Sequence, residues 1–233
     1  MGKRIIQQRR GKGTLTFRVS PQAYNIRLSY PNVEGKGRII KLVSHAGHTA
    51  PLALMKVGKA YFYNVAVEGL EEGQEVSMGK DAELKSGNII PLSTSQVGTN
   101  LCNLEITPLS GGKLVRASGI SAIVTKKLAG KVALLLPSKE EKLFDENARA
   151  TVGIIAGGGR LDKPFVKAGS RWHLMRARNK LYPRTSPIKM NSVNHPFGGG
   201  RGKNVGKSSI APTNAPPGRK VGLLRPRKTG RGK

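Results

Sequence analysis

The stretch LALMKVGKAYFYNVAVE, residues 52–68, decides the fold class of this chain. In its second part, residues 60–68, the side chains follow a period of two with one mixed face, which is typical of a half-buried β-strand. Short runs of this kind, bounded by Gly, Pro or Asn, recur before and after it along the chain. We therefore expect an all-β fold.

Working outward from this stretch, the same criteria give a series of short strands between residues 38 and 156. The predicted strands are 38–44, 52–57, 60–68, 74–78, 89–92, 103–107, 114–118, 122–126, 131–136, 142–144 and 151–156. The connections 110–112 and 129–130 are turn-like, and no long amphipathic helix interrupts the series. Such spacing favours small β-barrels or sandwiches. We place a boundary near Ser86 and predict two small barrels, with a single larger sandwich as the alternative.

The charge of the chain is divided unevenly. All 13 acidic residues lie between Glu34 and Asp162, so the formal charge of +28 divides into +7 for residues 1–33, +3 for 34–162 and +18 for 163–233. Two purely cationic arms repel themselves unless a polyanion neutralises them. Nucleic acid is the partner that this pattern favours.

The C-terminal arm, residues 163–233, is rich in Gly, Pro, Lys, Arg, Ser and Asn and poor in large apolar residues. Such a chain cannot bury enough apolar area to offset the entropy of ordering, so we expect it to be extended, and disordered when alone. Apolar residues within it, such as Ile210 and Leu223, argue against a tract that only supplies charge.

The remaining composition predicts a soluble, intracellular protein that binds no membrane. Cys102 is the single cysteine, which excludes an intramolecular disulfide and a Cys-only metal site. The N-terminal MGKRIIQQRR has no apolar run behind its basic residues and does not resemble a signal peptide. No stretch approaches the roughly 20 apolar residues of a membrane span.

Two glycine motifs suggest nucleotide enzymes, and neither fits. GRGKNVGKS, residues 200–208, has Arg201 where a phosphate-binding P-loop needs its first glycine. The glycines 157–159 follow a predicted strand, but the next residues do not begin a helix as a dinucleotide fingerprint requires. We interpret this second motif as a loop whose backbone passes close to another group.

The histidines do not predict catalysis or metal binding. His45 and His48 lack a third ligand at a metal-binding spacing and are interpreted as loop residues or contacts to RNA. His173, beside Trp172, is expected to stack or to form a hydrogen bond. His195 lies in NSVNHPFGGG, residues 191–200, in a 71-residue segment without a carboxylate to orient a general base. We expect packing or RNA contact there, no cofactor, no metal and no catalytic residue.

The basic arms contain the candidate binding residues. Arginine suits bidentate phosphate contacts and stacking on bases, and Trp172 offers an aromatic platform for an unpaired base. The predicted RNA-binding residues are Lys3, Arg4, Arg9, Arg10, Lys12, Arg171, Trp172, Arg176, Arg178, His195, Arg201, Lys203, Lys207, Arg219, Lys220, Arg225, Arg227 and Lys228.

Several of these segments resemble one known family. NSVNHPFGGG is similar to the Asn-Pro-Val-acid-His-Pro-His/Phe-Gly-Gly-Gly signature of the universal second protein of the large ribosomal subunit. The further matching segments, in the order of the family, are GNIIPLSTSQVGTNLCNLE (87–105), GGKLVRASGISAIV (111–124), RATVGIIAGGGRLDKP (149–164) and APPGRKVGLL (215–224). The last two resemble the archaeal and eukaryotic branch. Two positions depart from the signature, because Ser192 replaces its proline and Asn194 replaces its carboxylate.

The resemblance implies an oligonucleotide-binding-type (OB-like) barrel, an SH3-like barrel and a long C-terminal extension. We accordingly expect a basic arm at 1–33, the OB-like barrel at 34–85, the SH3-like barrel at 86–170 and an extended tail at 171–233. The implied location is the cytoplasmic ribosome. The implied partners are large-subunit ribosomal RNA near the peptidyl transferase centre, neighbouring ribosomal proteins, and small-subunit RNA at an intersubunit contact.

Three functions are weighed on this basis. The sequence favours a structural RNA-binding protein that also supports subunit association. The first alternative is an enzyme in which His195 takes part in peptide-bond formation, which the missing carboxylates disfavour. The second is an independent binder of single-stranded nucleic acid. An independent binder has no need of about 70 residues that fold only on assembly.

Overall fold

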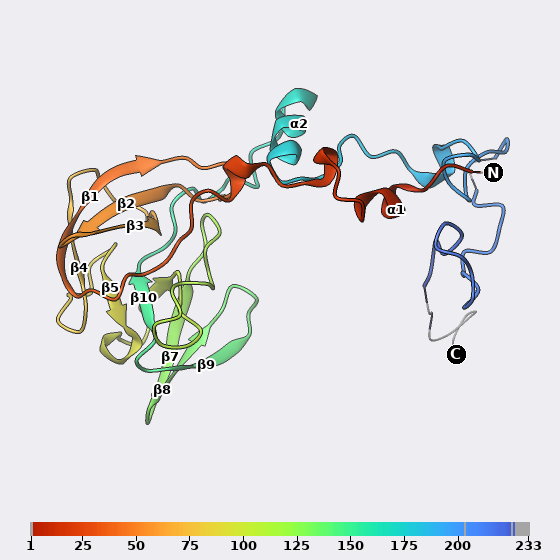
Figure 1. The fold of residues 1–233 in the computed structure, drawn as a ribbon. Coiled ribbons are helices and arrows are strands. Elements are labelled where there is room, and N and C mark those ends of the chain that lie inside the picture. The colour runs from red at the N-terminus through yellow and green to blue at the C-terminus, as the bar shows by residue number, and fades with distance from the viewer. Residues whose placement is uncertain (1, 203, 225, 227–233) are drawn as a thin grey trace. The chain divides into compact units, whose positions relative to one another are not determined.

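The computed structural model describes residues 2–202, 204–224 and 226 (Figure 1). The chain forms two compact units. We call residues 21–166 the β unit, and residues 1–20 together with 167–233 the arm unit. None of the helices in the described ranges is both long and apolar enough to cross a membrane.

The β unit consists of strands joined by loops of different lengths, of which residues 103–121 are the longest, and of two short 3-10 helices at Pro21–Ala23 and Leu92–Thr94. The strands are β1 (Gly35–Val43), β2 (Leu52–Val57), β3 (Ala60–Val65), β4 (Glu75–Met78), β5 (Ile89–Pro91), β6 (Asn100–Cys102), β7 (Ala122–Leu128), β8 (Lys131–Leu135), β9 (Glu141–Asp145) and β10 (Arg149–Val152). They lie in one sheet in the order β3-β2-β1-β4-β5-β10-β6-β7-β8-β9. The all-β prediction is confirmed.

The sheet has a weak point between β4 and β5. These strands meet in parallel at the single pair Met78–Ile89, whereas the other neighbours pair antiparallel. Figure 1 shows β1 to β4 in the upper part of the β unit and β7 to β9 in the lower part. Register shifts within β1 and β7 bend the two parts further.

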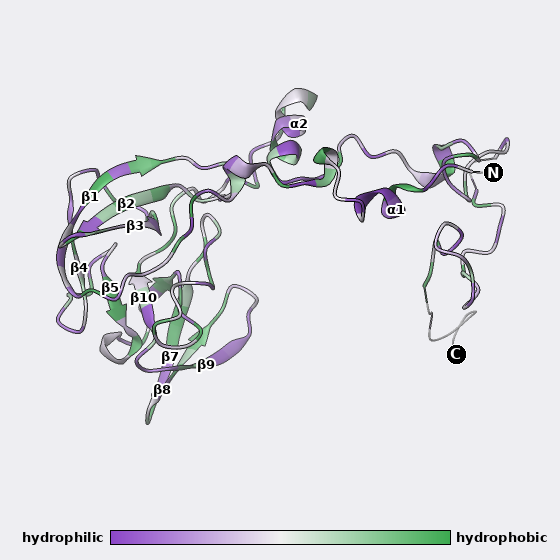
Figure 2. Ribbon diagram, in the orientation of Figure 1, coloured by the Kyte–Doolittle hydropathy of each residue, from purple (hydrophilic) through white to green (hydrophobic). Residues whose placement is uncertain are grey.

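Each part of the sheet has its own hydrophobic core. Leu52 and Met55 are fully buried in the first core, which β1 to β4 dominate. Ile90 and Leu134 are fully buried in the second, which lies among β5 to β10. Figure 2 shows the hydrophobic colour concentrated along these strands. The apolar side chains whose alternation predicted the strands therefore form the buried face of each part of the sheet.

Two predicted strands are wrong. Residues 103–107 and 114–118 form no strand, and β6 ends just before the first of them. Asn103 and Val115 have positive φ angles of 47° and 52°, in the left-handed region that ends an extended strand. Leu104 and Leu114 make only an isolated bridge. The left-handed conformations at Asn103 and Val115 override the strand preference of the surrounding residues.

A buried polar network connects the strands with the segment before β1. The Tyr30 hydroxyl lies 2.7 Å from both the Asn103 carbonyl oxygen and Thr151 Oγ1. Asn64 donates to the same Thr151 oxygen at 3.0 Å and accepts from the Asn103 side chain at 2.8 Å. Leu28 and Tyr30, in the stretch assigned from sequence to the basic arm, are buried in the first core. This segment is thus held both by packing and by hydrogen bonds.

The described residues of the arm unit form two short α-helices, α1 (Ile6–Arg10) and α2 (Ala168–Ala177), and two 3-10 helices, Leu15–Phe17 and Pro187–Lys189. The prediction of extended chain throughout the arms is wrong at these positions. Residues 171–177, RWHLMRA, contain no glycine or proline, and Leu, Met, Arg and Ala are good helix formers. Neither α-helix contains a buried residue, and α2 has no side-chain cap at its start. Helices this short are marginal in water without packing.

Candidate nucleic-acid interface

The arm unit carries an unbalanced positive charge. Its residues include 23 Lys and Arg and no Asp or Glu. Within the described part of the chain, the ion pairs are Glu83–Lys85 and Glu105–Arg149, and both lie in the β unit. The described cations of the arm unit therefore have no carboxylate partner, and a polyanion is the ligand that would relieve their repulsion.

Around α2 the structure combines cations with aromatic rings. The Arg176 guanidinium lies 5.2 Å from the centre of the Trp172 ring, one helical turn away, and Arg171 lies 5.4 Å from the Tyr182 ring. Trp172 is 38% exposed, and its edge meets His173 at 4.9 Å between ring centres. Three predicted residues thus form an exposed surface of ring faces and guanidinium groups. Such surfaces stack on unpaired bases.

The loop of residues 190–200 is held by its own backbone. The Gly199 N–H donates to the Met190 carbonyl at 3.0 Å, and the Gly198 N–H donates to the His195 carbonyl at 2.9 Å. A Cβ atom at position 198 would overlap the carbonyl oxygens of Met190 and Asn191. The first glycine of the GGG motif is therefore needed because the chain closes tightly on itself.

His195 has a structural role in this loop. Its Nδ1 accepts the Phe197 N–H at 3.1 Å, and the two rings lie 5.3 Å apart. Phe197 is buried. Partial burial lowers the pKa of His195 below its ordinary value of 6.5, so the imidazole is neutral at pH 7. Because Nδ1 accepts, Nε2 carries the hydrogen and can donate to a ligand.

The segment after this loop returns to pack against it. Ile210 and Leu223 form a parallel bridge, and the Leu223 N–H donates to the Ser209 carbonyl at 2.8 Å. A Cβ at Gly222 would overlap that carbonyl oxygen and lie 3.1 Å from the Phe197 ring. The apolar residues that distinguish this tail from a simple basic tract thus help to shape it.

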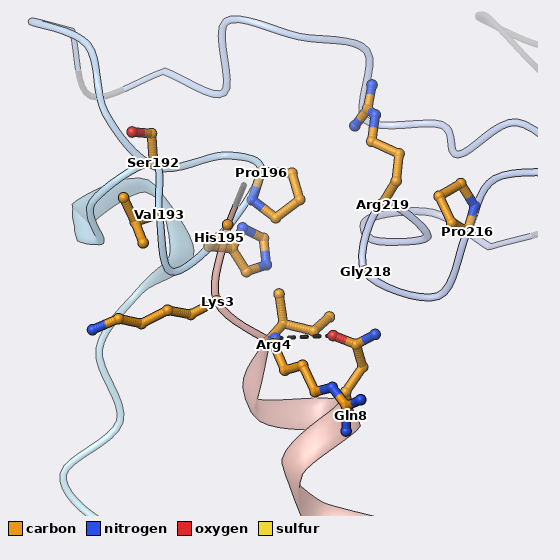
Figure 3. A pocket seen from close by; sticks show the side chains of 12 residues that line it. Lys3, Arg4, Gln8, Ser192, Val193, His195, Pro196, Pro216, Gly218 and Arg219 are labelled. Carbon is orange, nitrogen blue, oxygen red and sulfur yellow. Dashed lines mark hydrogen bonds between the residues drawn. The ribbon is translucent and has the colours of Figure 1, made fainter.

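The N-terminal segment contacts the C-terminal arm at two places, one of which is the loop of residues 190–200. The Lys3 N–H donates to the Val193 carbonyl at 2.8 Å, and the Asn179 side chain donates to the Phe17 carbonyl. An open hollow of about 380 Å³ is lined by residues 2–5 and 8 from the N-terminal segment, 192, 193, 195 and 196 from the loop, and 216, 218 and 219 from the tail. Figure 3 shows His195 and Pro196 opposite Arg219 and Pro216 in this hollow.

The predicted binding residues fall into three groups. Lys3, Arg4, His195 and Arg219 are brought together around the hollow. The exposed residues elsewhere in the arm unit are Arg9, Arg10, Lys12, Arg171, Trp172, Arg176, Arg178, Arg201 and Lys207, and Lys220 is half-buried. Lys203, Arg225, Arg227 and Lys228 lie outside the described residues.

The sequence missed the uncharged walls of the hollow. Ile5, Gln8, Val193 and Pro196 line it together with the cations. No spacing rule connects residues from opposite ends of a chain. Their apolar or amide side chains also carry no charge signal.

In the β unit, His45 and His48 contact each other, and the glycine motif at residues 157–159 contacts a second loop. His45 Nδ1 lies 2.9 Å from His48 Nδ1, and His45 Nε2 lies 2.7 Å from the Asn25 side-chain oxygen. A Cβ at Gly119 would lie 2.5 Å from the Cα of Gly158. The close backbone approach predicted for glycines 157–159 is therefore to another loop of the β unit.

Comparison with known proteins agrees with these features. The family model described as Ribosomal Proteins L2, C-terminal domain, matches residues 85–214. The large ribosomal subunit protein uL2 of Methanococcoides burtonii is 43% identical over 237 residues, which cover 99% of this chain and 100% of that protein. The uL2 proteins of Archaeoglobus fulgidus and Korarchaeum cryptofilum are each 44% identical, over 99% and 100% of this chain and 99% and 97% of their own lengths. These relatives are archaeal, as the resemblance of its C-terminal segments implies. The chain belongs to the uL2 family of large-subunit ribosomal proteins.

Proposed function

We propose that this protein is a structural, non-enzymatic component that binds large-subunit ribosomal RNA with its two basic arms near the peptidyl transferase centre and supports association of the ribosomal subunits. Its membership of the uL2 family places it in the ribosome. The proposed partners are large-subunit RNA, neighbouring ribosomal proteins and, at an intersubunit contact, small-subunit RNA.

The observation that carries this proposal is the combination of charge and exposure in the arm unit. Twenty-three cations without an acidic residue would repel one another in the free protein. The helix α2 has no buried side chain through which packing could stabilise it. Phosphates would supply the missing counter-charge, and bases would cover the exposed ring of Trp172.

For the β unit we propose that the two cores correspond to an OB-like barrel followed by an SH3-like barrel. The two buried clusters and the single Met78–Ile89 pair between β4 and β5 support a division close to the one predicted near Ser86. The limits 34–85 and 86–170, and the arms at 1–33 and 171–233, remain predictions.

A non-enzymatic role for His195 follows from its surroundings. The imidazole uses Nδ1 to hold the loop, and the arm unit has no carboxylate that could orient it as a general base. We propose that His195 packs and positions the loop against RNA, and that RNA supplies the groups that react.

Cosedimentation tests the proposal. Tagged protein should sediment with intact large subunits and stay bound through a high-salt wash. The variant Arg176→Gln, which removes a cation beside Trp172, should be released at lower salt than wild type. Lys139→Gln is the matched control, because Lys139 lies in the β unit beside Glu140 and Glu141. Protein found only with free RNA, or washed off at moderate salt, would contradict the proposal.

A further inference from the structure

The hollow in the arm unit has the dimensions of a small-ligand site. Its volume of about 380 Å³ falls within the roughly 300–1,000 Å³ typical of such sites. Three separate segments form its walls, and the 2.8 Å hydrogen bond from Lys3 to Val193 holds the first against the second. The Gly218 backbone lies close to the Gln8 side chain, since a Cβ there would be 3.5 Å from Gln8 Oε1. The hollow is therefore an open depression whose walls are held near one another by these contacts.

One part of the hollow is lined by rings and an apolar side chain. The rings of Pro196, Pro216 and His195 face it, and so does Ile5, which is 6% exposed. The His195 ring is fixed in position because its Nδ1 is engaged by the Phe197 N–H. Fixed rings of this kind are suited to the face of a planar group.

The polar side chains around these rings offer mainly donors. Arg4 and Arg219 provide guanidinium groups. Gln8 accepts the Ile5 N–H with Oε1 at 3.0 Å, which leaves its NH₂ free to donate. His195 has only its Nε2–H left to offer. A ligand that fits this set must combine acceptor atoms, negative charge and a flat ring.

We propose that this hollow receives a single unpaired nucleotide of ribosomal RNA, with its base against Pro196 and His195 and its phosphate on Arg4 and Arg219. The inference rests on the proposed function and specifies one site within it. A duplex would keep its bases stacked inside the helix, whereas single-stranded loops and bulges can present one base at a time. A free anion would use the guanidinium groups and leave the rings uncovered.

The site requires both ends of the chain. Arg4, Ile5 and Gln8 come from the N-terminal arm, while His195 and Arg219 come from the C-terminal arm. At this site the two arms would therefore bind the same nucleotide together.

Photo-crosslinking in assembled large subunits tests this site. The photoreactive residue p-benzoylphenylalanine replaces Val193 in one variant and Lys3 in another, one from each end of the chain. Leu15, which is 86% exposed in the same unit and does not line the hollow, is the control position. Crosslinked RNA bases are located by reverse transcription. Crosslinks from Val193 and Lys3 should converge on the same or an adjacent nucleotide, and those from Leu15 should fall elsewhere.

A second measurement examines the guanidinium groups. In subunits containing Arg4→Ala and Arg219→Ala together, the reactivity of that nucleotide toward base-modifying reagents should rise about fivefold or more, as expected when a stacked base is released. Lys139→Ala, which removes an exposed cation of the β unit outside the hollow, should leave that reactivity unchanged.

The outcomes separate this site from the general function. If Leu15 still crosslinks to RNA but Val193 and Lys3 crosslink to unrelated nucleotides, or to protein alone, the nucleotide site is overturned and the general function is not. An unchanged reactivity of the nucleotide in the double variant would overturn the nucleotide site as well. Loss of RNA crosslinks at all three positions would overturn the proposed function too.

Discussion

Replacing His195 with glutamine distinguishes a structural histidine from a catalytic one. We predict that large subunits carrying His195→Gln transfer peptide at nearly the wild-type rate once they are assembled. The reason is local, because His195 Nδ1 is occupied by the Phe197 N–H at 3.1 Å and its pKa is lowered by burial. The damage should appear in assembly or in subunit joining.

The expected magnitude follows from the hydrogen bond. A glutamine side-chain oxygen can accept the same Phe197 N–H, so the loss is smaller than a whole hydrogen bond, which is worth about 1 kcal/mol. That corresponds to less than a tenfold change in the fraction of correctly formed loop. A general base contributes roughly 10²–10⁴-fold to the rate of the chemical step. The two roles therefore differ by at least about an order of magnitude.

The assay is single-turnover peptide transfer by purified large subunits at equal protein occupancy. His195→Ala is the companion variant, because it leaves the Phe197 N–H without its acceptor and should impair assembly more than glutamine does. His173→Gln, at an exposed histidine of α2, controls for loss of an imidazole as such. A deficit of about a hundredfold in fully assembled His195→Gln subunits would refute the structural role.

Four further predictions concern charge and stability. Deleting 201–233 removes ten Lys and Arg, so the slope of log affinity against log salt should flatten by up to about 7–9 at 0.7–0.9 per phosphate; equal slopes would show that the tail is not an electrostatic anchor. Glu105→Ala strands the buried Arg149 guanidinium and should cost about 3–5 kcal/mol in urea unfolding, whereas a loss below about 1 kcal/mol would contradict the role of this pair. Burial, His45 and Arg116 lower the pKa of His48, so its NMR titration midpoint should fall below 6.5; the stability it contributes is present above that pH and is lost as the pH falls through the depressed pKa. In the free protein trypsin should cut the arm unit before the β unit, and protection of the arm unit would disprove this order.

Most of the β unit could be predicted because alternation and turn residues act over a few neighbours. The runs 52–57 and 131–136 match β2 and β8 almost residue for residue. The failures at 103–107 and 114–118 occur where Asn103 and Val115 adopt left-handed backbone conformations within a tertiary turn. A β-branched residue such as Val115 rarely adopts that conformation, so local preference predicts the opposite.

The candidate site also has a part that could be predicted from the sequence and a part that could not. Its cations could be read from the sequence because charge survives any conformation. Its walls could not, since Ile5 and Pro196 become neighbours only when the two ends of the chain fold together. The helix α2 does not follow from the glycine- and proline-rich composition of the whole tail, because residues 171–177 form a local exception that contains neither residue.

On the proposed function, the lack of buried side chains in α2 would couple the folding of this helix to RNA binding during ribosome assembly. A helix whose stability comes from its RNA partner reports whether that RNA has reached its correct shape. On a misfolded RNA site α2 would unwind, and its basic residues would become accessible to proteases.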